Sequence, residues 1–387
     1  MIDYEKVQSQ RQRSVKPLAI EEFFNLSPDV ISLGIGEPDF DTPKKAGFAA
    51  IAAIVNGDTS YPPSEGIPEL RQELSRFMAS NNGYDYSPQE ILITVGGSLG
   101  LDCTMRAFIE DGDEVILPTP TFPSYDPAIR MCGGTVVEVA TRAEDGFRLR
   151  AEDLRAAITE RTKMVVLNYP NNPTGVSLTA EDYAQIADVL RDTQIVVLSD
   201  EIYSELTYDL SRHSILDQPG MRERTILVSG FSKRFAMTGW RIGYVCAPRE
   251  LLRPVSKCHS FAVMCAPSIA QYAALAGLQQ CEMDVKEMVE EYRRRRDYVM
   301  ERFAKLNWPC VLPNGAFYAF PSIKSTGLSS EDFCRRLLRE GGVAVVPGNG
   351  FGAGGEGFIR ISYAYNMDIL KAAFDRIDEF VQVNGLC

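Results

Sequence analysis

Short apolar runs alternate with stretches of helical periodicity through the middle of the chain. The runs are rich in Val, Ile and Leu and are too short for buried helices. Helical stretches lie between most of them, an order typical of a mostly parallel sheet with helices on both faces. The pattern predicts an α/β protein with a three-layer α/β/α large domain. Its seven strand-like runs cover residues 91–95, 114–117, 135–139, 164–167, 195–198, 225–228 and 242–247.

The two ends of the chain show other patterns. Residues 1–30 form a polar arm that includes an amphipathic piece ending at Phe24, and a short strand then begins at Ile31. Two helices are expected, over residues 43–56 and 67–81. A long charged helix is expected over residues 283–305, with opposite charges at helical spacing that suit an exposed face. The segments after this helix have an α+β order, so we place a domain boundary near residue 280.

Composition narrows the possible functions. A chain of 387 residues suggests two domains. Its net charge of −12 argues against general affinity for nucleic acid or for an anionic membrane surface. No apolar run approaches the roughly 20 residues that span a bilayer. The nine cysteines form no C-x-x-C pair and there are only two histidines, so we expect no metal site and a reducing, cytoplasmic location.

The most specific chemistry lies in residues 229–244. Gly230 ends an apolar run, so Lys233 follows the end of a strand, where open α/β sheets bind ligands. A lysine amine in a dry pocket loses its charge and becomes a nucleophile towards carbonyls. Arg241 can offer a planar fork to a phosphate. Together with the hydroxyls of Ser229 and Ser232, these groups suit a phosphorylated cofactor that carries a carbonyl, and pyridoxal phosphate is such a cofactor.

Residues 96–100, Gly-Gly-Ser-Leu-Gly, lie between a predicted strand and a predicted helix. They match G-x-S-x-G, the nucleophile elbow of α/β-hydrolases, with Ser98 as the nucleophile. That interpretation needs an acid and then a histidine downstream, and His259 is the candidate. The segment equally resembles a glycine-rich helix N-terminus, which binds phosphate through free N–H groups. A tight-packing turn is the third possibility.

Several other polar or aromatic residues follow predicted strands. Phe122 could stack on a pyridine ring, or it could pack in the core. A carboxylate at Asp200 is costly at a buried strand end unless it is paired, and a protonated pyridine nitrogen would suit it; a helix N-cap is the alternative. Asn172 lies in a rigid turn, Asn168-Tyr-Pro-Asn-Asn-Pro-Thr-Gly175. Arg360 lies on an apolar strand, where an arginine is rarely without a partner; that partner could be a ligand, or it could be an acidic residue in a structural ion pair.

These segments occur in the order and approximate spacing found in the fold-type I, class I/II aminotransferases. The chain resembles this family from Gly36-Glu-Pro-Asp39 to Arg360, most specifically in the Lys233 segment and the N-P-T-G turn. The resemblance implies that Lys233 forms a Schiff base with pyridoxal 5'-phosphate and moves the substrate proton. It implies that Asp200 faces the pyridine nitrogen and that Phe122 stacks on the ring. Two donors are implied for the phenolic oxygen, Asn172 and Tyr203.

The resemblance also implies how phosphate and substrate are held. The cofactor phosphate would contact Gly97, Ser98, Leu99, Ser232 (or Ser229) and Arg241, with Tyr61 reaching it from the neighbouring subunit of a homodimer. The substrate carboxylate would be held by Arg360, Asn172 and the backbone at Gly36. Leu99-Gly100 departs from many relatives, which carry a polar residue and an alanine. The N-terminal arm would fold back on the C-terminal part, giving a large domain over 46–280 and a small α+β domain from 1–45 and 281–387.

The expected function is transfer of an amino group from an L-amino acid to a 2-oxo acid by a ping-pong course, with aspartate or an aromatic amino acid as donor and 2-oxoglutarate as acceptor. One alternative uses the same cofactor residues: a C–S lyase similar to cystathionine beta-lyase. A serine hydrolase acting through Ser98 is an alternative from another class. A non-enzymatic sensor would carry a helix-turn-helix, for which residues 1–30 are too short.

Overall fold

A seven-stranded sheet forms the centre of the computed structural model, which describes residues 2–4, 6–15, 27–209 and 211–386. The strand order is β2-β8-β7-β6-β5-β3-β4, and every pairing is parallel except those of β8 with β2 and β7. Each strand begins and ends within two residues of its predicted run. The strands are β2 (Ile91–Thr94), β3 (Glu114–Thr119), β4 (Thr135–Ala140), β5 (Thr162–Asn168), β6 (Val196–Asp200), β7 (Thr225–Gly230) and β8 (Gly243–Cys246).

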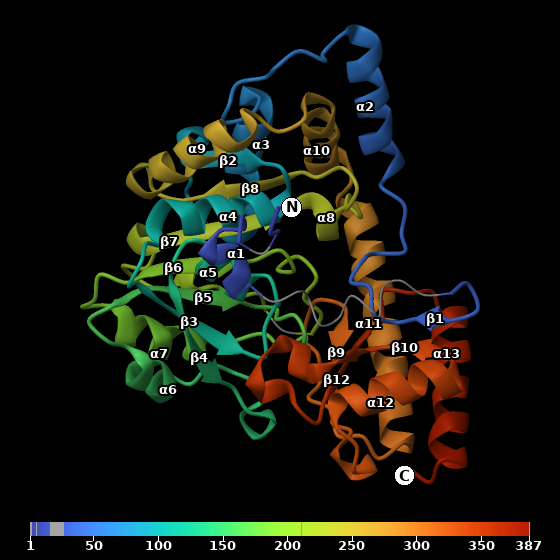
Figure 1. Ribbon diagram of the computed structural model, residues 1–387. Helices are drawn as coiled ribbons and strands as arrows, with labels where there is room; N and C mark the ends of the chain where they lie inside the picture. The colour runs from blue at the N-terminus through green and yellow to red at the C-terminus, as the bar shows by residue number, and fades with distance from the viewer. Residues whose placement is uncertain (1, 5, 16–26, 210, 387) are drawn as a thin grey trace.

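Helices cover both faces of this sheet (Figure 1). Val115 packs in a core cluster with side chains of α4, α5 and α9, whereas Ile116 packs with side chains of α6 and α7. Successive residues of a strand point to opposite faces, which is why the inner strands are mainly apolar on both faces, whereas the edge strand β4 carries exposed Thr135 and Glu138. The predicted three-layer arrangement is therefore confirmed. Its helices are α3 (Pro68–Phe77), α4 (Gly96–Phe108), α5 (Tyr125–Met131), α6 (Ala151–Ala157), α7 (Ala180–Leu190), α8 (Phe231–Arg234), α9 (Arg249–Val263) and α10 (Ser268–Gln280).

The C-terminal part has its own small sheets and helices, beginning with the long helix α11 (Glu282–Lys305), as predicted. A three-stranded antiparallel sheet has the order β11-β12-β9, and β1 pairs with β10 in parallel. The domain boundaries near residues 45 and 280 stay a prediction. The remaining elements are β1 (Ile31–Ser32), β9 (Tyr318–Ala319), β10 (Val343–Ala344), β11 (Val346–Pro347), β12 (Ile359–Ser362), α12 (Ser330–Arg336) and α13 (Met367–Val383).

The N-terminal region contains two of the expected helices. α2 (Lys44–Asn56) matches the first, and α3 with its π-helical extension over Met78–Asn82 matches the second, with Pro68 in its first turn. The amphipathic piece ending at Phe24 lies outside the described residues. α1 (Gln10–Ser14) lies near α5, and Arg11 pairs at 2.9 Å with Asp111, in the turn between α4 and β3. Among the helices in the described part of the chain, none is long and apolar enough to cross a membrane.

One turn ties the sheet to the C-terminal part. The carbonyl oxygen of Gly175, at the end of the N-P-T-G turn after β5, accepts hydrogen bonds from the backbone N–H groups of Asn314 (2.8 Å) and Gly315 (3.0 Å). Gly175 has a φ of +71°, and a Cβ there would collide with the carbonyl oxygen of Tyr318. Glycine therefore satisfies both the left-handed backbone and the close approach. The contact holds the turn, and Asn172 within it, against the segment that leads into β9.

We predict that Gly175→Ala destabilises the protein more than Gly220→Ala does. Gly220 also has a positive φ (+77°), but a Cβ there would meet open space. Backbone strain alone should lower the free energy of unfolding by about 1 kcal/mol at Gly220. The collision at Gly175 should cost at least about 2 kcal/mol more. Urea unfolding of both cofactor-free variants measures the difference, and equal losses would contradict the packing argument.

Candidate active site

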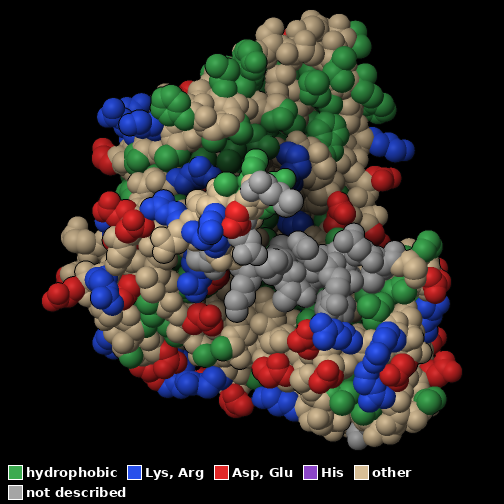
Figure 2. Space-filling view, in the orientation of Figure 1, with side chains coloured by type: hydrophobic (Ala, Val, Ile, Leu, Met, Phe, Trp, Pro, Cys, Tyr) green, Lys and Arg blue, Asp and Glu red, His purple; other side chains and the backbone are tan. Residues whose placement is uncertain are grey.

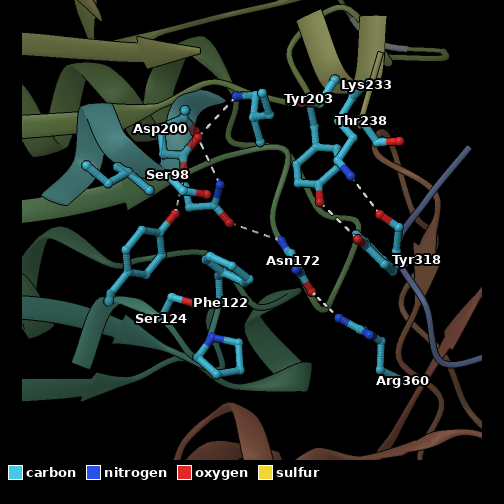
Figure 3. Close-up of a pocket in the computed structure, with 18 of the residues that line it drawn as sticks. Ser98, Phe122, Ser124, Asn172, Asp200, Tyr203, Lys233, Thr238, Tyr318 and Arg360 are labelled. Atoms are coloured by element: carbon cyan, nitrogen blue, oxygen red, sulfur yellow. Dashed lines mark hydrogen bonds between the residues drawn. The ribbon is translucent and has the colours of Figure 1, made fainter. Parts of the chain in front are cut away.

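A cavity opens past the carboxyl ends of β5, β6 and β7, between the sheet and the C-terminal part (Figure 3). Three of its residues stand at or just after these strand ends: Asn168 ends β5, Asp200 ends β6, and Lys233 follows β7. Parallel strands bring their carboxyl ends to one edge, which explains why distant segments meet here. The walls comprise Gly36, Gly97, Ser98, Leu101, Phe122, Pro123, Ser124, Tyr125, Asn168, Asn172, Asp200, Ile202, Tyr203, Ser232, Lys233, Thr238, Arg241, Tyr318 and Arg360.

Lys233 lies on the single turn of α8, directly after β7. Its Nζ donates a hydrogen bond of 2.6 Å to the carbonyl oxygen of Gly36. Removal of water from the amine lowers the pKa of Lys233 to about 8, and the cations Arg241 and Arg360 act in the same direction. A larger fraction of this amine is therefore neutral near pH 7 than for an ordinary lysine. Such an amine can act as a nucleophile or accept a proton.

Asp200 is a carboxylate that is only 5% exposed and has no cationic partner among the described residues. The Tyr125 hydroxyl donates to its Oδ2 at 2.6 Å, and the backbone N–H of Ile202 donates to Oδ1 at 3.2 Å. Burial raises the pKa of Asp200 to about 6, while these hydrogen bonds oppose the rise. A positively charged heterocyclic nitrogen would supply the counter-ion that the carboxylate lacks.

Two hydrogen-bond donors face the same cavity. The Oδ1 of Asn172 accepts from Nη1 of Arg360 at 3.0 Å, which leaves the Nδ2 amide as the group that can donate to a ligand. The hydroxyl of Tyr203 lies 2.9 Å from that of Tyr318, and both side chains are buried. Figure 3 shows Asn172 and Tyr203 extending into the cavity from different elements. The structure thus brings together the two residues expected to contact a phenolic oxygen.

The N-terminus of α4 forms the end of the cavity suited to an anion. Gly97, Ser98 and Leu99 lie in its first turn, where backbone N–H groups have no partner within the helix. Gly97 and Ser98 line the cavity, but the side chain of Leu99 packs against a core cluster. Only the backbone of Leu99 is therefore available to an anion.

Arg241 and a serine complete this end of the cavity. A Cβ at Gly96 would lie 2.8 Å from Nη2 of Arg241, so glycine allows the guanidinium to lie close to the start of the helix. Ser232 lines the cavity beside Lys233. The Ser229 hydroxyl is not among the lining groups and donates to the carbonyl oxygen of Glu201 at 3.1 Å. Of the two flanking serines, the structure therefore places Ser232 at the site.

Arg360, on β12, is a buried cation only 4% exposed. Besides its contact with Asn172 it donates from Nη2 to the carbonyl oxygen of Gly34, and its Nε has no partner. Its guanidinium carbon lies 4.7 Å from the ring centroid of Tyr318 and 4.9 Å from that of Phe351. No carboxylate of the described residues pairs with it, so the structural ion pair considered from sequence is not found there. The arrangement leaves the guanidinium ready for a ligand carboxylate.

Of the two aromatic residues predicted to contact the cofactor ring or its phosphate, Phe122 lies in the cavity wall and Tyr61 does not. Phe122 lines the cavity and meets Tyr125 edge to face, with ring centroids 5.6 Å apart. Tyr61 lies on the loop after α2, is 82% exposed, and is not part of the cavity wall. Within one chain the structure does not bring Tyr61 to the other predicted residues. Its expected role across a subunit interface stays a prediction.

The site residues predicted from sequence do not include Tyr125 or Tyr318, although both line the cavity and contact predicted site residues. A signal for Tyr125 existed, since it follows Phe122 by three residues in the same segment. Tyr318 had only an aromatic neighbour, Phe317, to mark it. Thr238 and Ser124 also line the cavity, with no sequence pattern that would distinguish them from loop residues.

The donor set fits pyridoxal 5'-phosphate. The cavity offers an amine of lowered pKa, a carboxylate without a counter-ion, two neutral donors and a helix N-terminus beside an arginine. These match the aldehyde, the ring nitrogen, the phenolic oxygen and the phosphate of that cofactor. No histidine is among the described residues of the cavity wall, and His259 is fully buried on α9. The hydrolase interpretation of Ser98 therefore has no histidine base at this site.

Comparison with known proteins agrees with this chemistry. The model of the family described as "Aminotransferase class I and II" matches residues 28–377. A Bacillus subtilis (strain 168) protein named "Probable N-acetyl-LL-diaminopimelate aminotransferase" is 44% identical, over 96% of this chain and 95% of that protein. An aspartate aminotransferase of Pyrococcus abyssi (strain GE5 / Orsay) is 43% identical, over 98% of this chain and 99% of its own length.

A solved structure shows the same agreement in three dimensions. The aromatic aminotransferase from Pyrococcus horikoshii OT3 superposes with a TM-score of 0.91 at 42% identity, covering 96% of this chain and all of that one. Sequence and fold thus match along nearly the whole length, including every segment that forms the cavity. The chain belongs to the class I and II aminotransferases and is a transaminase whose family cofactor is pyridoxal 5'-phosphate.

Proposed function

We propose that this transaminase takes the amino group from an L-amino acid and passes it to a 2-oxo acid in a ping-pong course. The observation that carries the proposal is Arg360, a buried guanidinium without an anion, in the same cavity as the desolvated amine of Lys233. Amino acid and 2-oxo acid share an α-carboxylate, so one clamp serves both in turn. One cavity with one carboxylate clamp favours alternate rather than simultaneous binding.

The bound cofactor supplies an aldehyde that takes up the amino group and a ring that accepts electrons. Asp200 would hold a positive charge at the ring nitrogen, and Asn172 Nδ2 and the Tyr203 hydroxyl would donate to the phenolic oxygen. The phosphate would be held by the N-terminus of α4 with Ser232 and Arg241. These roles rest on the placement of the side chains around one cavity.

Lys233 would act as the general base. Its lowered pKa leaves a useful neutral fraction near pH 7, so Nζ can take the proton from the substrate Cα and deliver it again. The hydrogen bond to the Gly36 carbonyl orients the amine within the cavity. Arg360, with Asn172 and the backbone near Gly36, would fix the carboxylate and thereby the position of Cα.

For the substrate, we propose aspartate or an aromatic amino acid as donor and 2-oxoglutarate as acceptor. Relatives named for aspartate and for aromatic substrates support both donors. The rings of Phe122, Tyr125 and Tyr318 in the cavity wall support an aromatic side chain. The three cations of the described wall all have proposed roles, so a distal carboxylate would need another group, such as one from a neighbouring subunit.

We propose a homodimer with shared active sites. Apolar side chains gather over the upper part of the molecule, where Figure 1 shows α2, α9 and α10 (Figure 2). Exposed apolar residues on α2 and on the end of α9 contribute, as does Tyr61. Exposed apolar surface of this kind marks interaction sites. The residues are Phe48, Ile51, Ile54, Val55, Tyr61, Phe261, Val263 and Met264.

We predict that Lys233→Ala loses transamination by roughly a thousandfold, because it removes both the nucleophile and the base. Rates should be measured with the cofactor-loaded protein, an amino donor and a 2-oxo acid. Lys305→Ala, at an exposed position on α11, is the matched control and should keep the wild-type rate. A wild-type rate in Lys233→Ala would contradict the proposal. Release of pyruvate from cystathionine without an acceptor, faster than amino transfer, would instead favour the C–S lyase.

An amino-donor panel, read by the spectral change of the cofactor in a single turnover, tests the substrate. Because an aromatic ring would be buried in the cavity, kcat/KM for phenylalanine or tyrosine should be roughly tenfold to a hundredfold higher than for alanine. The panel should also contain aspartate, glutamate and N-acetyl-LL-diaminopimelate. A preference for alanine over both aspartate and the aromatic donors would contradict the proposed specificity.

A charge on the apolar surface tests the dimer. We predict that the wild-type protein has twice the chain mass of 43.0 kDa in solution. Phe48→Asp should shift it towards one chain mass, because a carboxylate would be buried at the interface. Light scattering after size exclusion measures both, and Leu312→Asp, at an exposed apolar residue outside this surface, is the control. A monomeric wild-type protein would contradict the proposal.

A further inference from the structure

Tyr318 lies where three parts of the site meet. It is the first residue of β9, it is 1% exposed, and it lines the same cavity as Asp200 and Lys233. Figure 3 shows it between Tyr203 and Arg360. The proposed function uses Tyr318 only as one of the rings that support an aromatic side chain, because the carboxylate clamp and the cofactor donors are complete without it.

The hydroxyl of Tyr318 is paired with that of Tyr203 at 2.9 Å, across 115 positions of sequence. If Tyr203 gives its own proton to the phenolic oxygen, its oxygen is left to accept, and the Tyr318 hydroxyl is the donor. A donor that itself accepts a hydrogen bond is strengthened, because hydrogen bonds in a chain polarise one another. Tyr318 thus acts on the cofactor through Tyr203 without touching it.

The ring of Tyr318 serves the carboxylate clamp. The guanidinium carbon of Arg360 lies 4.7 Å from its centroid, within the range of a cation–π contact. Phe351 provides a second ring at 4.9 Å, but this residue is not among the described lining residues of the cavity and has no hydrogen bond to Tyr203. Both aromatic residues therefore help to place Arg360, but only Tyr318 also contacts Tyr203.

The hydroxyl also occupies the space beside Gly36. A Cβ on Gly36 would collide with the Tyr318 oxygen, so the position of the tyrosine requires a glycine at residue 36. The carbonyl oxygen of Gly36 is the acceptor for Lys233 Nζ. The position of Tyr318 therefore also bears on the backbone that orients the amine.

We propose that Tyr318 is a positioning residue that couples the carboxylate clamp to the cofactor side of the site, through its ring on Arg360 and its hydroxyl on Tyr203. This inference rests on the proposed roles of Arg360 and Tyr203. Other titratable or charged groups of the described wall also face this region and stay unchanged in the variants below. They are Tyr125, Asp200, Lys233 and Arg241.

The experiment compares four variants in the cofactor-loaded protein. The readouts are kcat and KM for one amino donor, and the pH midpoint of the visible absorbance without substrate. Tyr318→Phe keeps the ring and removes the hydroxyl, so Tyr203 becomes a weaker donor and the negative form of the phenolic oxygen is less stabilised. The midpoint should rise by about half a unit to one unit, with kcat about tenfold lower and KM within about threefold of wild type.

The other variants separate the ring from the hydroxyl. Phe351→Leu should raise KM about fivefold with no shift of the midpoint, since it removes only a ring near Arg360. Tyr318→Leu removes both the ring and the hydroxyl, so it should show the higher midpoint and lower kcat of Tyr318→Phe together with the higher KM of Phe351→Leu. Tyr363→Phe is the control, because it loses a hydroxyl contact with Tyr208 (3.4 Å) in the buried core away from the cavity, and it should match wild type in every readout.

A wild-type midpoint and kcat in Tyr318→Phe would overturn the inference, as would a midpoint shift in Phe351→Leu as large as that in Tyr318→Phe. Thermal unfolding of each cofactor-free variant shows that it is folded. If Tyr318→Leu fails to fold, Tyr318→Phe and Phe351→Leu still decide the question. Loss of activity in Lys233→Ala together with wild-type behaviour of Tyr318→Phe would reject this inference alone and leave the proposed function standing.

Discussion

The buried guanidinium of Arg360 donates to a side-chain amide and to a backbone carbonyl and lies against two aromatic rings, but its Nε has no partner and no anion of the described residues pairs with its charge. Burying a charge without a counter-ion is costly. The cost is tolerated where a ligand supplies the missing charge. We propose that the segments that hold Arg360, from residue 34 to the β9–β12 sheet, are arranged to bind the carboxylate of a ligand.

Asp200 presents the opposite case in the same cavity. It is a buried carboxylate that receives hydrogen bonds from Tyr125 and the backbone but pairs with no cation in the described part of the chain. The two unpaired charges lie on different parts of the molecule and form no ion pair with each other. Such a site suits ligands that place an anionic group beside Arg360 and a cationic group beside Asp200. An amino acid carboxylate and a protonated cofactor ring are such groups.

The sheet explains why these groups can be held so close together. Parallel strands β5, β6 and β7 end side by side; Asn168 and Asp200 are the last residues of the first two, and Lys233 follows the third. The N-P-T-G turn then connects this edge to the C-terminal part through Gly175. Contacts that cross between the two parts, such as Arg360 with Asn172 and Tyr203 with Tyr318, complete the cavity. The position of Asn172 thus depends on that of Arg360, and the position of Tyr203 on that of Tyr318.

Local sequence was enough to predict the seven strands and the strand-end positions of Asn172, Asp200 and Lys233, because apolar runs and Gly or Pro breakers act over a few residues. It was also enough to indicate the family chemistry at Lys233. Only the tertiary structure showed that Ser232 rather than Ser229 lines the cavity, that Leu99 turns its side chain to the core, and that Tyr125 and Tyr318 support Asp200 and Tyr203. Those contacts join residues 75 and 115 positions apart, and no local pattern specifies which distant side chains packing will bring together.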